Sequence, residues 1–396
     1  MNESSARILF DAIRAALQNE TIDVDDPRLS NASYLEQALR LAAQHDLTHL
    51  LIQGLSQAAI DRFFSEKAKQ TPLMAAFRYQ QSNYELLRIC EILANNQIPY
   101  MPLKGSVVRD YYPEPWMRTS CDIDVLVRHE DLSRAVSCLV DALNYEMRGQ
   151  YTHDVSLFSQ SKVHIELHFN LIEDSVSPAS ARILSNVWES ACPLQNSPYH
   201  LGMSDEMLYF YHIAHMAKHF ENGGCGIRPF IDLWLLDHLE GADHAKRDAL
   251  LLQGELLTFA NVARRLSRVW FEDAAMDVLS LQMEDYILRG GVYGNIENRI
   301  LVQQQKKGGR IRYALSKLFI PYDVIKYHYP ILQKHRWLVP VMQVRRWGRL
   351  IFCGHFKRTA RELKYNNSIS GVDADNTQRF LRDIGLQSNV SEAHLN

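Results

Sequence analysis

Two aspartates one residue apart, Asp122 and Asp124, open an apolar run that ends at Val127. Alternate side chains of a β-strand point to the same side, so a strand here places both carboxylates on one face and Ile123 and Val125 on the other. Two adjacent negative charges repel each other, and proteins usually tolerate such a pair where a positive charge lies between them. Carboxylate oxygens are hard ligands, so the pair predicts a site for a divalent cation such as Mg²⁺.

A turn upstream of this pair has the residue types of a phosphate site. Lys104, Gly105 and Ser106 follow an apolar stretch at 98–103 that is typical of a short strand, and Val107 begins a helical pattern. Ser106 is expected to cap this helix, and the exposed amides of a helix start can hold a phosphate group. Lys104 is either a surface lysine or a direct nucleotide contact.

The segment 163–169 alternates between apolar and polar side chains, which predicts an amphipathic strand. Its polar face carries His164, Glu166 and His168. Glu166 is a candidate for a third carboxylate beside the aspartate pair, and the alternative is an exposed residue of a hairpin. The two histidines are expected to pack around the site or to support its ligands rather than to bind metal themselves.

The order of these motifs resembles the polymerase-beta-like nucleotidyltransferase superfamily, in which a Gly-Ser turn precedes an Asp-x-Asp strand and a later strand carries one acidic residue. A bacterial family of less characterised nucleotidyltransferases is similar in more detail. The residues that carry this resemblance are Leu103-Lys104-Gly105, Arg118-x-x-x-Asp122-Ile123-Asp124-Val125-Leu126-Val127 and Glu166-Leu167-His168. The close match covers about residues 97–175, and a looser one extends from His215 to Asp232.

This resemblance implies a site and a reaction. In the superfamily, sheet carboxylates hold two Mg²⁺ (or Mn²⁺) ions, and an acceptor hydroxyl attacks the α-phosphorus of a nucleoside triphosphate, releasing pyrophosphate. By resemblance the catalytic and metal-binding residues are Asp122, Asp124 and Glu166. The nucleotide-binding residues are Lys104, Gly105, Ser106 and Arg118.

Arg118 and the later helical part each have more than one interpretation. Arg118 either contacts phosphate or pairs structurally with Asp122 or Glu114. The helical pattern 207–220 places His215 and two other histidines on one face, which either lines a substrate cleft or packs; without a cysteine or acidic cluster in register, a metal site there is not favoured. The residues expected at a substrate cleft are His168, His215, Arg228 and Asp232.

The whole chain has the composition of a globular protein. Of its 396 residues, 46% are hydrophobic and 22% are charged, and the net charge of −3 provides no global field for nucleic acid. The first residues lack a signal-peptide pattern, and no window of 18 uninterrupted apolar residues predicts a membrane-spanning helix. Six scattered cysteines without a Cys-x-x-Cys motif favour reduced thiols and a cytoplasmic protein.

Hydrophobic periodicity predicts an α+β fold, with a small mixed β-sheet flanked by N- and C-terminal helical regions. The resemblance implies that this sheet is the nucleotidyltransferase core. Within the core we expect strands at 122–127, 154–158 and 163–169, a helix from Leu132 to Leu143, and helices on one side of the sheet. The expected divisions are an N-terminal helical region (1–96), the core (97–175), a helical substrate or lid region (176–300), a basic aromatic helical flank (301–365) and a loosely held polar tail (366–396).

The segment Lys306–Lys364 differs in charge from the rest of the chain. It contains 15 lysines and arginines and two acidic residues, a net charge of +13, so the remainder carries −16. Aromatic residues are interleaved with the basic ones, a pattern that binds nucleic acid or an anionic surface in some proteins. The alternative, which we favour, is a helical flank folded back onto the acidic remainder.

The function expected from these residues is metal-dependent transfer of a nucleoside monophosphate, with ATP the expected donor. The acceptor is open among a small molecule, a sugar, a protein and RNA. Two alternatives remain: kinase-like phosphoryl transfer from the same site, and a nucleotide-binding module without catalysis. The three filled carboxylate positions argue against the last alternative.

Overall fold

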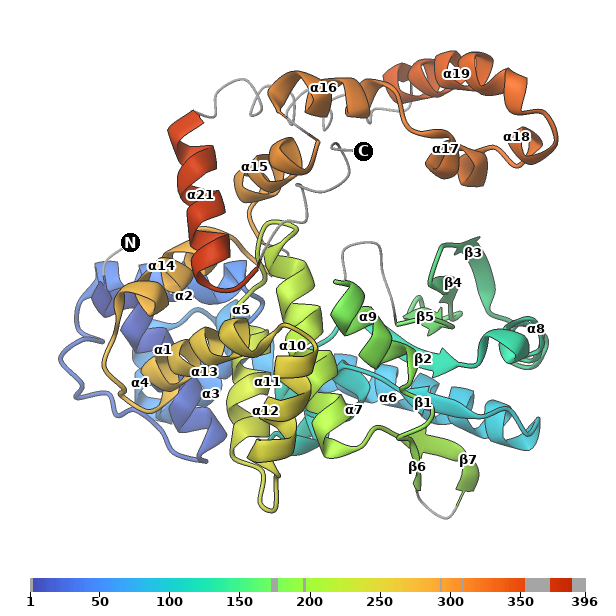
Figure 1. Ribbon diagram of the computed structural model, residues 1–396. Coiled ribbons are helices and arrows are strands. Elements are labelled where there is room, and N and C mark those ends of the chain that lie inside the picture. Colours follow the sequence, from blue (N-terminus) through green and yellow to red (C-terminus); the bar gives the residue numbers. More distant parts are fainter. Residues whose placement is uncertain are drawn as a thin grey trace. The chain divides into compact units, whose positions relative to one another are not determined.

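The structure is a computed structural model that describes residues 3–171, 177–194, 197–292, 294–307, 309–352 and 371–386. By its internal contacts the chain divides into two compact units. The first comprises Met1–Ala217 and Gly226–Val292, and the second comprises Lys218–Cys225 and Tyr293–Asn396. The predicted α+β class is confirmed, because helices precede and follow a mixed β-sheet along the chain (Figure 1).

The chain begins with helices, as the spacing of its apolar residues predicts. Their bounds are α1 Glu3–Leu17, α2 Ala32–Gln44, α3 Thr48–Gln53, α4 Gln57–Phe63, α5 Glu66–Lys69 and α6 Thr71–Asn95. Side-chain caps fix several starts; the Asn31 side chain, for example, accepts hydrogen bonds from the amides of Ser33 and Tyr34 at the start of α2. The long helix α6 ends where the polar sequence Asn95-Asn96-Gln97 leads into the sheet.

The sheet has the strand order β3-β4-β5-β2-β1-β7-β6. Strand β2 is parallel to β5 and antiparallel to β1, β1 is parallel to β7, and the remaining neighbours are antiparallel. The strands are β1 Tyr100–Pro102, β2 Asp122–Val127, β3 Glu146–Gln150, β4 Asp154–Phe158, β5 His164–His168, β6 Cys192–Leu194 and β7 Ser197–Gly202. The predicted strands at 122–127, 154–158 and 163–169 are confirmed as β2, β4 and β5.

One expectation about this sheet is wrong, and one strand is not expected. The region 176–300 is expected to be helical, yet β6 and β7 lie there. Strand β3 is not predicted from the sequence. Strand β7 is held by parallel pairing with β1, where Tyr100 lies opposite His200 and their rings stack with centroids 5.0 Å apart. Short strands at a sheet edge depend on such neighbours more than on their own periodicity.

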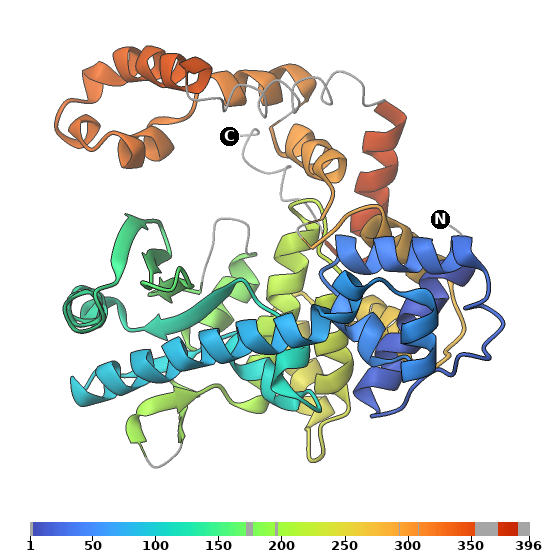
Figure 2. The ribbon, with the colours of Figure 1, turned by 180° about the vertical axis from the view of Figure 1, so that it is seen from behind.

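One face of the sheet forms the hydrophobic core. Ile123, Val125 and Val127 of β2 are buried there together with Ile165 and Leu167 of β5. Helices α6 and α8 (Leu132–Leu143) pack on this face (Figure 2). Each fully buried aliphatic side chain contributes about 1.5–3 kcal/mol, which fixes the register and leaves the opposite face to the polar residues.

The first unit is completed by further helices. Their bounds are α7 Gly105–Val108, α9 Pro178–Ser185, α10 Asp205–Phe220, α11 Arg228–Asp237, α12 His244–Gln253, α13 Leu257–Phe271 and α14 Val278–Leu288; α10 continues a few residues into the second unit. Three short 3₁₀ turns lie between them, η1 Arg109–Tyr111, η2 Pro115–Met117 and η3 His129–Asp131. Phe230 of α11 packs against Trp270 of α13, with ring centroids 5.0 Å apart.

The second unit includes the basic segment Lys306–Lys364. Its helices are α15 Ile296–Lys306, α16 Arg310–Leu318, α17 Tyr322–His328, α18 Ile331–Lys334, η4 Arg336–Leu338, α19 Val339–Phe352 and α21 Gly371–Asp383. Ile325, Leu332 and Met342 form a small core within it. The expectation of a loosely held tail is wrong for α21 and the residues just after it, because Phe380, Leu381, Ile384 and Leu386 are buried; residues 353–370 and 387–396 lie outside the described part. Among the described helices, none is long and apolar enough to cross a membrane.

Candidate active site

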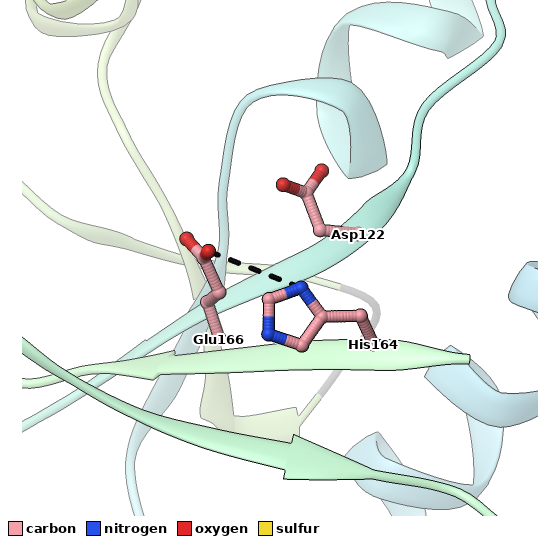
Figure 3. A group of neighbouring side chains, drawn as sticks. All are labelled: Asp122, His164 and Glu166. Carbon is pink, nitrogen blue, oxygen red and sulfur yellow. Dashed lines mark ion pairs between the residues drawn. The ribbon is translucent and has the colours of Figure 1, made fainter. Parts of the chain in front are cut away.

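The polar face of the sheet gathers the predicted carboxylates on two neighbouring strands. In the parallel pairing of β2 with β5, Asp122 lies opposite His164 and Asp124 lies opposite Glu166. Because side chains two residues apart share a face, the three carboxylates lie on the side of the sheet away from the hydrophobic core. Figure 3 shows Asp122 and Glu166 on this face, with the ring of His164 pointing toward Glu166.

Asp124 is the best-held carboxylate of the group. Its Oδ1 accepts hydrogen bonds from Lys104 Nζ at 2.7 Å and from His168 Nε2 at 2.8 Å. Burial alone would raise the pKa of Asp124, but the ammonium of Lys104 and the hydrogen bond from His168 outweigh it, so the pKa lies well below its usual value. Asp124 is therefore an ionised carboxylate with two resident partners.

Asp122 and Glu166 have different environments from Asp124. Burial, and then the nearby charge of Asp124, raise the pKa of Asp122 to about 6. The hydrogen bond from His168 lowers the pKa of Glu166, against the effect of burial; His168 Nε2 lies 3.4 Å from Glu166 Oε2. A bound cation would stabilise the ionised form of a carboxyl whose pKa is raised by a like charge. The raised pKa of Asp122 therefore indicates where a cation would stabilise the site most.

Lys104 reaches Asp124 from a strained turn. Its backbone has φ 45° and ψ −118°, a conformation that favours glycine, and it occupies the position just before α7. The prediction that Ser106 caps this helix is wrong, because Ser106 lies inside α7 and its amide donates to the carbonyl of Leu103 at 3.0 Å. The hydroxyl of Ser106 is buried and has no hydrogen-bond partner among the described residues.

Arg118 pairs with Asp232 of α11, not with Asp122 or Glu114. Its Nε and Nη2 donate to the two carboxylate oxygens at 2.8 and 2.7 Å, and Tyr112 donates to the same carboxylate at 2.7 Å. Burial would raise the pKa of Asp232, but the charge of Arg118 outweighs it and lowers the pKa. This planar, two-bond pair fixes the Arg118 side chain beside the turn.

The same guanidinium defines the space at Gly105. A Cβ at position 105 would lie 2.4 Å from Arg118 Nη1, so only glycine leaves room for it. Arg109, which sequence reasoning did not select, holds the other side: its Nε donates to the Gly105 carbonyl at 2.6 Å and its Nη2 to Ser120 at 3.1 Å. Burial and the charge of Arg118 lower the pKa of Arg109 to about 10. Arg109 follows Gly105 by four residues, and this spacing in a helical segment is the sequence feature that could have indicated their contact.

The residues expected at a substrate cleft have separate environments. His168 belongs to the carboxylate group, and Asp232 contacts the site through Arg118. Arg228 donates to Asp46 at 3.0 Å. His215 lies on α10 one turn after Tyr211, with ring centroids 6.3 Å apart. Burial alone would lower the pKa of Lys104, but Asp124, and after it Tyr211, raise this pKa. Helix α10 therefore approaches the site at Tyr211.

His164 is the second residue whose position sequence reasoning undervalued. Its Nε2 hydrogen-bonds Ser156 Oγ at 2.8 Å, and its Nδ1 lies 4.0 Å from Glu166 Oε1. Two groups of metal-ligating side chains occur in the part of the chain that the structure describes: Asp122 with His164 and Glu166, and Asp124 with Glu166 and His168. These carboxylate and imidazole donors fit a divalent cation.

Comparison with known proteins gives one match. No curated protein and no solved structure matches the chain. A family model described as an uncharacterised nucleotidyltransferase matches residues 32–272, a span that contains the whole sheet, the turn at Lys104 and the Arg118–Asp232 pair. Membership in such a family indicates a transferase that uses a nucleoside triphosphate. Because the match covers more than half of the sequence, the chain belongs to this family of uncharacterised nucleotidyltransferases.

Proposed function

We propose that the protein transfers a nucleoside monophosphate from a nucleoside triphosphate, ATP being the favoured donor, to a hydroxyl group of an acceptor, with release of pyrophosphate. The observation that carries this proposal is the pairing of β2 with β5, which brings Asp122, Asp124 and Glu166 onto one face. This arrangement lies within the span that matches a nucleotidyltransferase family.

Asp122, Asp124 and Glu166 form the proposed divalent metal centre, with Mg²⁺ or Mn²⁺ as the cofactor. Their oxygens are the ligands that such ions prefer, and the like charges of Asp122 and Asp124 favour a cation between them. A bound ion would neutralise phosphate charge and make an acceptor hydroxyl more acidic. His168 orients two of the three carboxylates through its contacts with Asp124 and Glu166.

The turn before α7 is the proposed triphosphate site. Gly105 lets the Arg118 guanidinium approach the backbone closely, and the buried Ser106 hydroxyl is available for a hydrogen bond. Lys104 adds a positive charge. Because the Ser106 amide already donates to the Leu103 carbonyl, the side chains of this turn are proposed to contribute more to phosphate binding than the Ser106 amide.

In the proposed nucleotidyl transfer, one bond to the α-phosphorus forms and another breaks. The acceptor oxygen forms a bond to the α-phosphorus while the bond from that phosphorus to the bridging oxygen of pyrophosphate breaks. The proton of the acceptor hydroxyl leaves to a base, and Glu166 is the proposed acceptor of that proton because His168 keeps its carboxylate ionised. Pyrophosphate leaves with the electrons of the broken bond.

The acceptor side is proposed to lie toward α10 and α11. His168 and His215 contribute imidazoles there, Asp232 positions Arg118, and Arg228 is held by Asp46. The acceptor class remains a small molecule, a sugar, a protein or RNA. Cys90, Cys138, Cys192 and Cys225 form no disulfide within the described part of the chain, which supports the proposal of a cytoplasmic protein.

One labelling experiment separates this function from its alternatives. The purified protein is incubated with Mg²⁺ and a cell extract, using ATP labelled at either the α- or the γ-phosphate. Label from the α-phosphate alone in an acceptor supports nucleotidyl transfer, whereas label from the γ-phosphate alone supports kinase-like transfer. Nucleotide binding without transfer of either label supports a binding module. Asp122→Asn should remove the transfer, and Asp141→Asn, at an exposed position on α8, is the matched control.

A further inference from the structure

Asp124 already has a cation that belongs to the chain. Lys104 Nζ lies 2.7 Å from Asp124 Oδ1, and the two side chains are 20% and 4% exposed. The lysine occupies a backbone conformation that favours glycine, with φ 45°. A glycine would relieve this strain but would remove the ammonium. Strain at a site is best explained by what it positions, which here is a positive charge on Asp124.

A second set of ligand atoms lies beside this pair. One ligand atom from each of Asp122, His164 and Glu166 lies within 4.8 Å of the other two (Figure 3). Ligands on opposite sides of an ion are about 4 Å apart when each metal–ligand distance is about 2.1 Å. Small side-chain rotations therefore bring all three atoms to one ion.

His164 makes this set more than a cluster of acidic residues. The hydrogen bond between Ser156 Oγ and His164 Nε2, at 2.8 Å, fixes the ring and leaves Nδ1 on the side of Glu166. Metal-binding histidines usually have their second ring nitrogen held in this way. The arrangement thus has both a nitrogen ligand and the partner that orients it.

The charges distinguish the Lys104–Asp124 pair from the set formed by Asp122, His164 and Glu166. Asp122 and Glu166 together balance one divalent ion, and the ammonium of Lys104 balances Asp124. A second divalent ion on Asp124 would lie next to that ammonium, and two cations at such a distance repel strongly in a partly buried site. One ion and one lysine therefore neutralise the three carboxylates.

We propose that the site binds a single divalent ion on Asp122, His164 and Glu166, and that Lys104 takes the place of a second ion at Asp124. The inference rests on the proposed function for the presence of a metal. It revises the ligand set proposed above by exchanging Asp124 for His164. It also differs from the two-ion arrangement that the family resemblance implies. A ligand set with one imidazole favours a first-row ion such as Mn²⁺ over Mg²⁺.

The first test counts and identifies ligands with Mn²⁺ as the probe. Full-length protein is treated with EDTA, dialysed and titrated with Mn²⁺, and the loss of the free-ion electron paramagnetic resonance signal gives the number bound. We expect one ion per chain, with a ¹⁴N coupling in pulsed spectra. His164→Asn should remove that coupling. His153→Asn, which changes a histidine stacked on His168 with ring centroids 5.9 Å apart, should leave it intact.

The second test changes the proposed internal cation. Lys104→Met should raise the number of bound Mn²⁺ ions from one to two, because Asp124 then lacks its ammonium. Lys104→Arg keeps the charge and should still bind one, and circular dichroism confirms that each variant is folded. Two ions in the wild-type protein, one ion in Lys104→Met, or no ¹⁴N coupling from His164 would overturn the inference.

These outcomes are distinct from those of the labelling experiment. Nucleotidyl transfer by a protein that binds two Mn²⁺ ions would support the proposed function and reject the single-ion site. One Mn²⁺ ion with a ¹⁴N coupling from His164, in a protein that transfers no nucleotide, would support the single-ion site and reject the proposed function.

Discussion

Lys104 and Asp124 are joined by the strand pairing that builds the centre of the sheet. The Leu103 amide donates to the Asp124 carbonyl at 3.0 Å, continuing the register in which Pro102 lies opposite Val125. The turn that follows then directs the Lys104 ammonium onto the Asp124 carboxylate at 2.7 Å. One backbone relationship therefore positions the turn at Lys104 and, through the lysine ammonium, favours the ionised form of the Asp124 carboxylate.

This pair predicts opposite stability effects for the two aspartates. In EDTA, Asp122→Asn removes one of two like charges and should leave the free energy of unfolding unchanged or increased. Asp124→Asn leaves Lys104 without its anion in a buried place and should lower it by about 3 kcal/mol or more. Urea unfolding measures both values, and both variants should lose nucleotide transfer.

The exposed variant Asp141→Asn controls for the change of one charge and should match the wild type in stability and activity. An Asp124→Asn protein as stable as the wild type would show that the ion pair with Lys104 does not contribute to folding.

The local parts of this site were predictable from the sequence. The alternation around Asp122 and Glu166 identified β2 and β5, because the side-chain period of a strand is a local property. The same period put Asp122 and Asp124 on one face of β2, and the parallel register of β2 with β5 places Glu166 beside Asp124. The helix α8 was equally predictable, since its apolar residues recur at helical spacing.

The partnerships between distant segments were not predictable. Nothing near Arg118 indicates that its carboxylate partner is Asp232, which is 114 residues later. The backbone strain at Lys104 depends on pairing between strands, and the role of His164 depends on Ser156 of the neighbouring strand. Contacts of this kind are set by the tertiary fold, so a single sequence carries no local signal for them.

The Arg118–Asp232 pair should behave as one unit. Asp232→Ala leaves a buried guanidinium and the Tyr112 hydroxyl without their acceptor, so the free energy of unfolding should fall by about 3–5 kcal/mol. The double variant Arg118→Met with Asp232→Leu removes both charges and should lose less stability than Asp232→Ala. Urea unfolding of the three proteins gives the comparison. A double variant less stable than Asp232→Ala would contradict the coupling.

Gly105 should be required for nucleotide binding. In Gly105→Ala the new Cβ would lie 2.4 Å from Arg118 Nη1, so the guanidinium must move from the turn. Calorimetric titration with ATP and Mg²⁺ should show affinity weakened about tenfold, which is about 1.4 kcal/mol. Gly348→Ala is the control, because a Cβ at that position meets no atom within 4 Å. Equal affinity for the Gly105→Ala and Gly348→Ala proteins would exclude the turn from the nucleotide site.

A buried histidine away from the carboxylates should make stability depend on pH. His45 is 1% exposed, and neither ring nitrogen has a hydrogen-bond partner among the described residues. Burial, and then the charge of Arg228, lower its pKa to about 4. As the pH falls below about 6.5, the unfolded chain takes up the proton first, so stability is lost between that pH and about 4.

The variant His45→Leu isolates this contribution. Between pH 7.5 and pH 5, the wild-type protein should lose about 2 kcal/mol more free energy of unfolding than His45→Leu does. At pH 7.5 the two proteins should differ little, since no hydrogen bond from the imidazole is lost. Parallel pH profiles for the two proteins would mean that His45 is protonated as readily in the folded state as in the unfolded state.

The basic segment Lys306–Lys364 provides the last prediction. Its charge of +13 opposes −16 in the remainder, and the described part has its own small core of Ile325, Leu332 and Met342. If the segment associates with the acidic remainder, trypsin should cleave its exposed lysines and arginines slowly at low salt and several-fold faster at high salt, because salt screens that attraction.

If the segment is instead a tRNA-binding surface, trypsin should cleave it rapidly in the absence of RNA. Its affinity for RNA should then fall steeply with salt, because binding releases condensed counterions. We expect the first result, since the aliphatic and aromatic residues of this segment exceed what a solvated tail requires. Tight, salt-sensitive tRNA binding would instead make RNA the leading acceptor for the proposed nucleotidyl transfer.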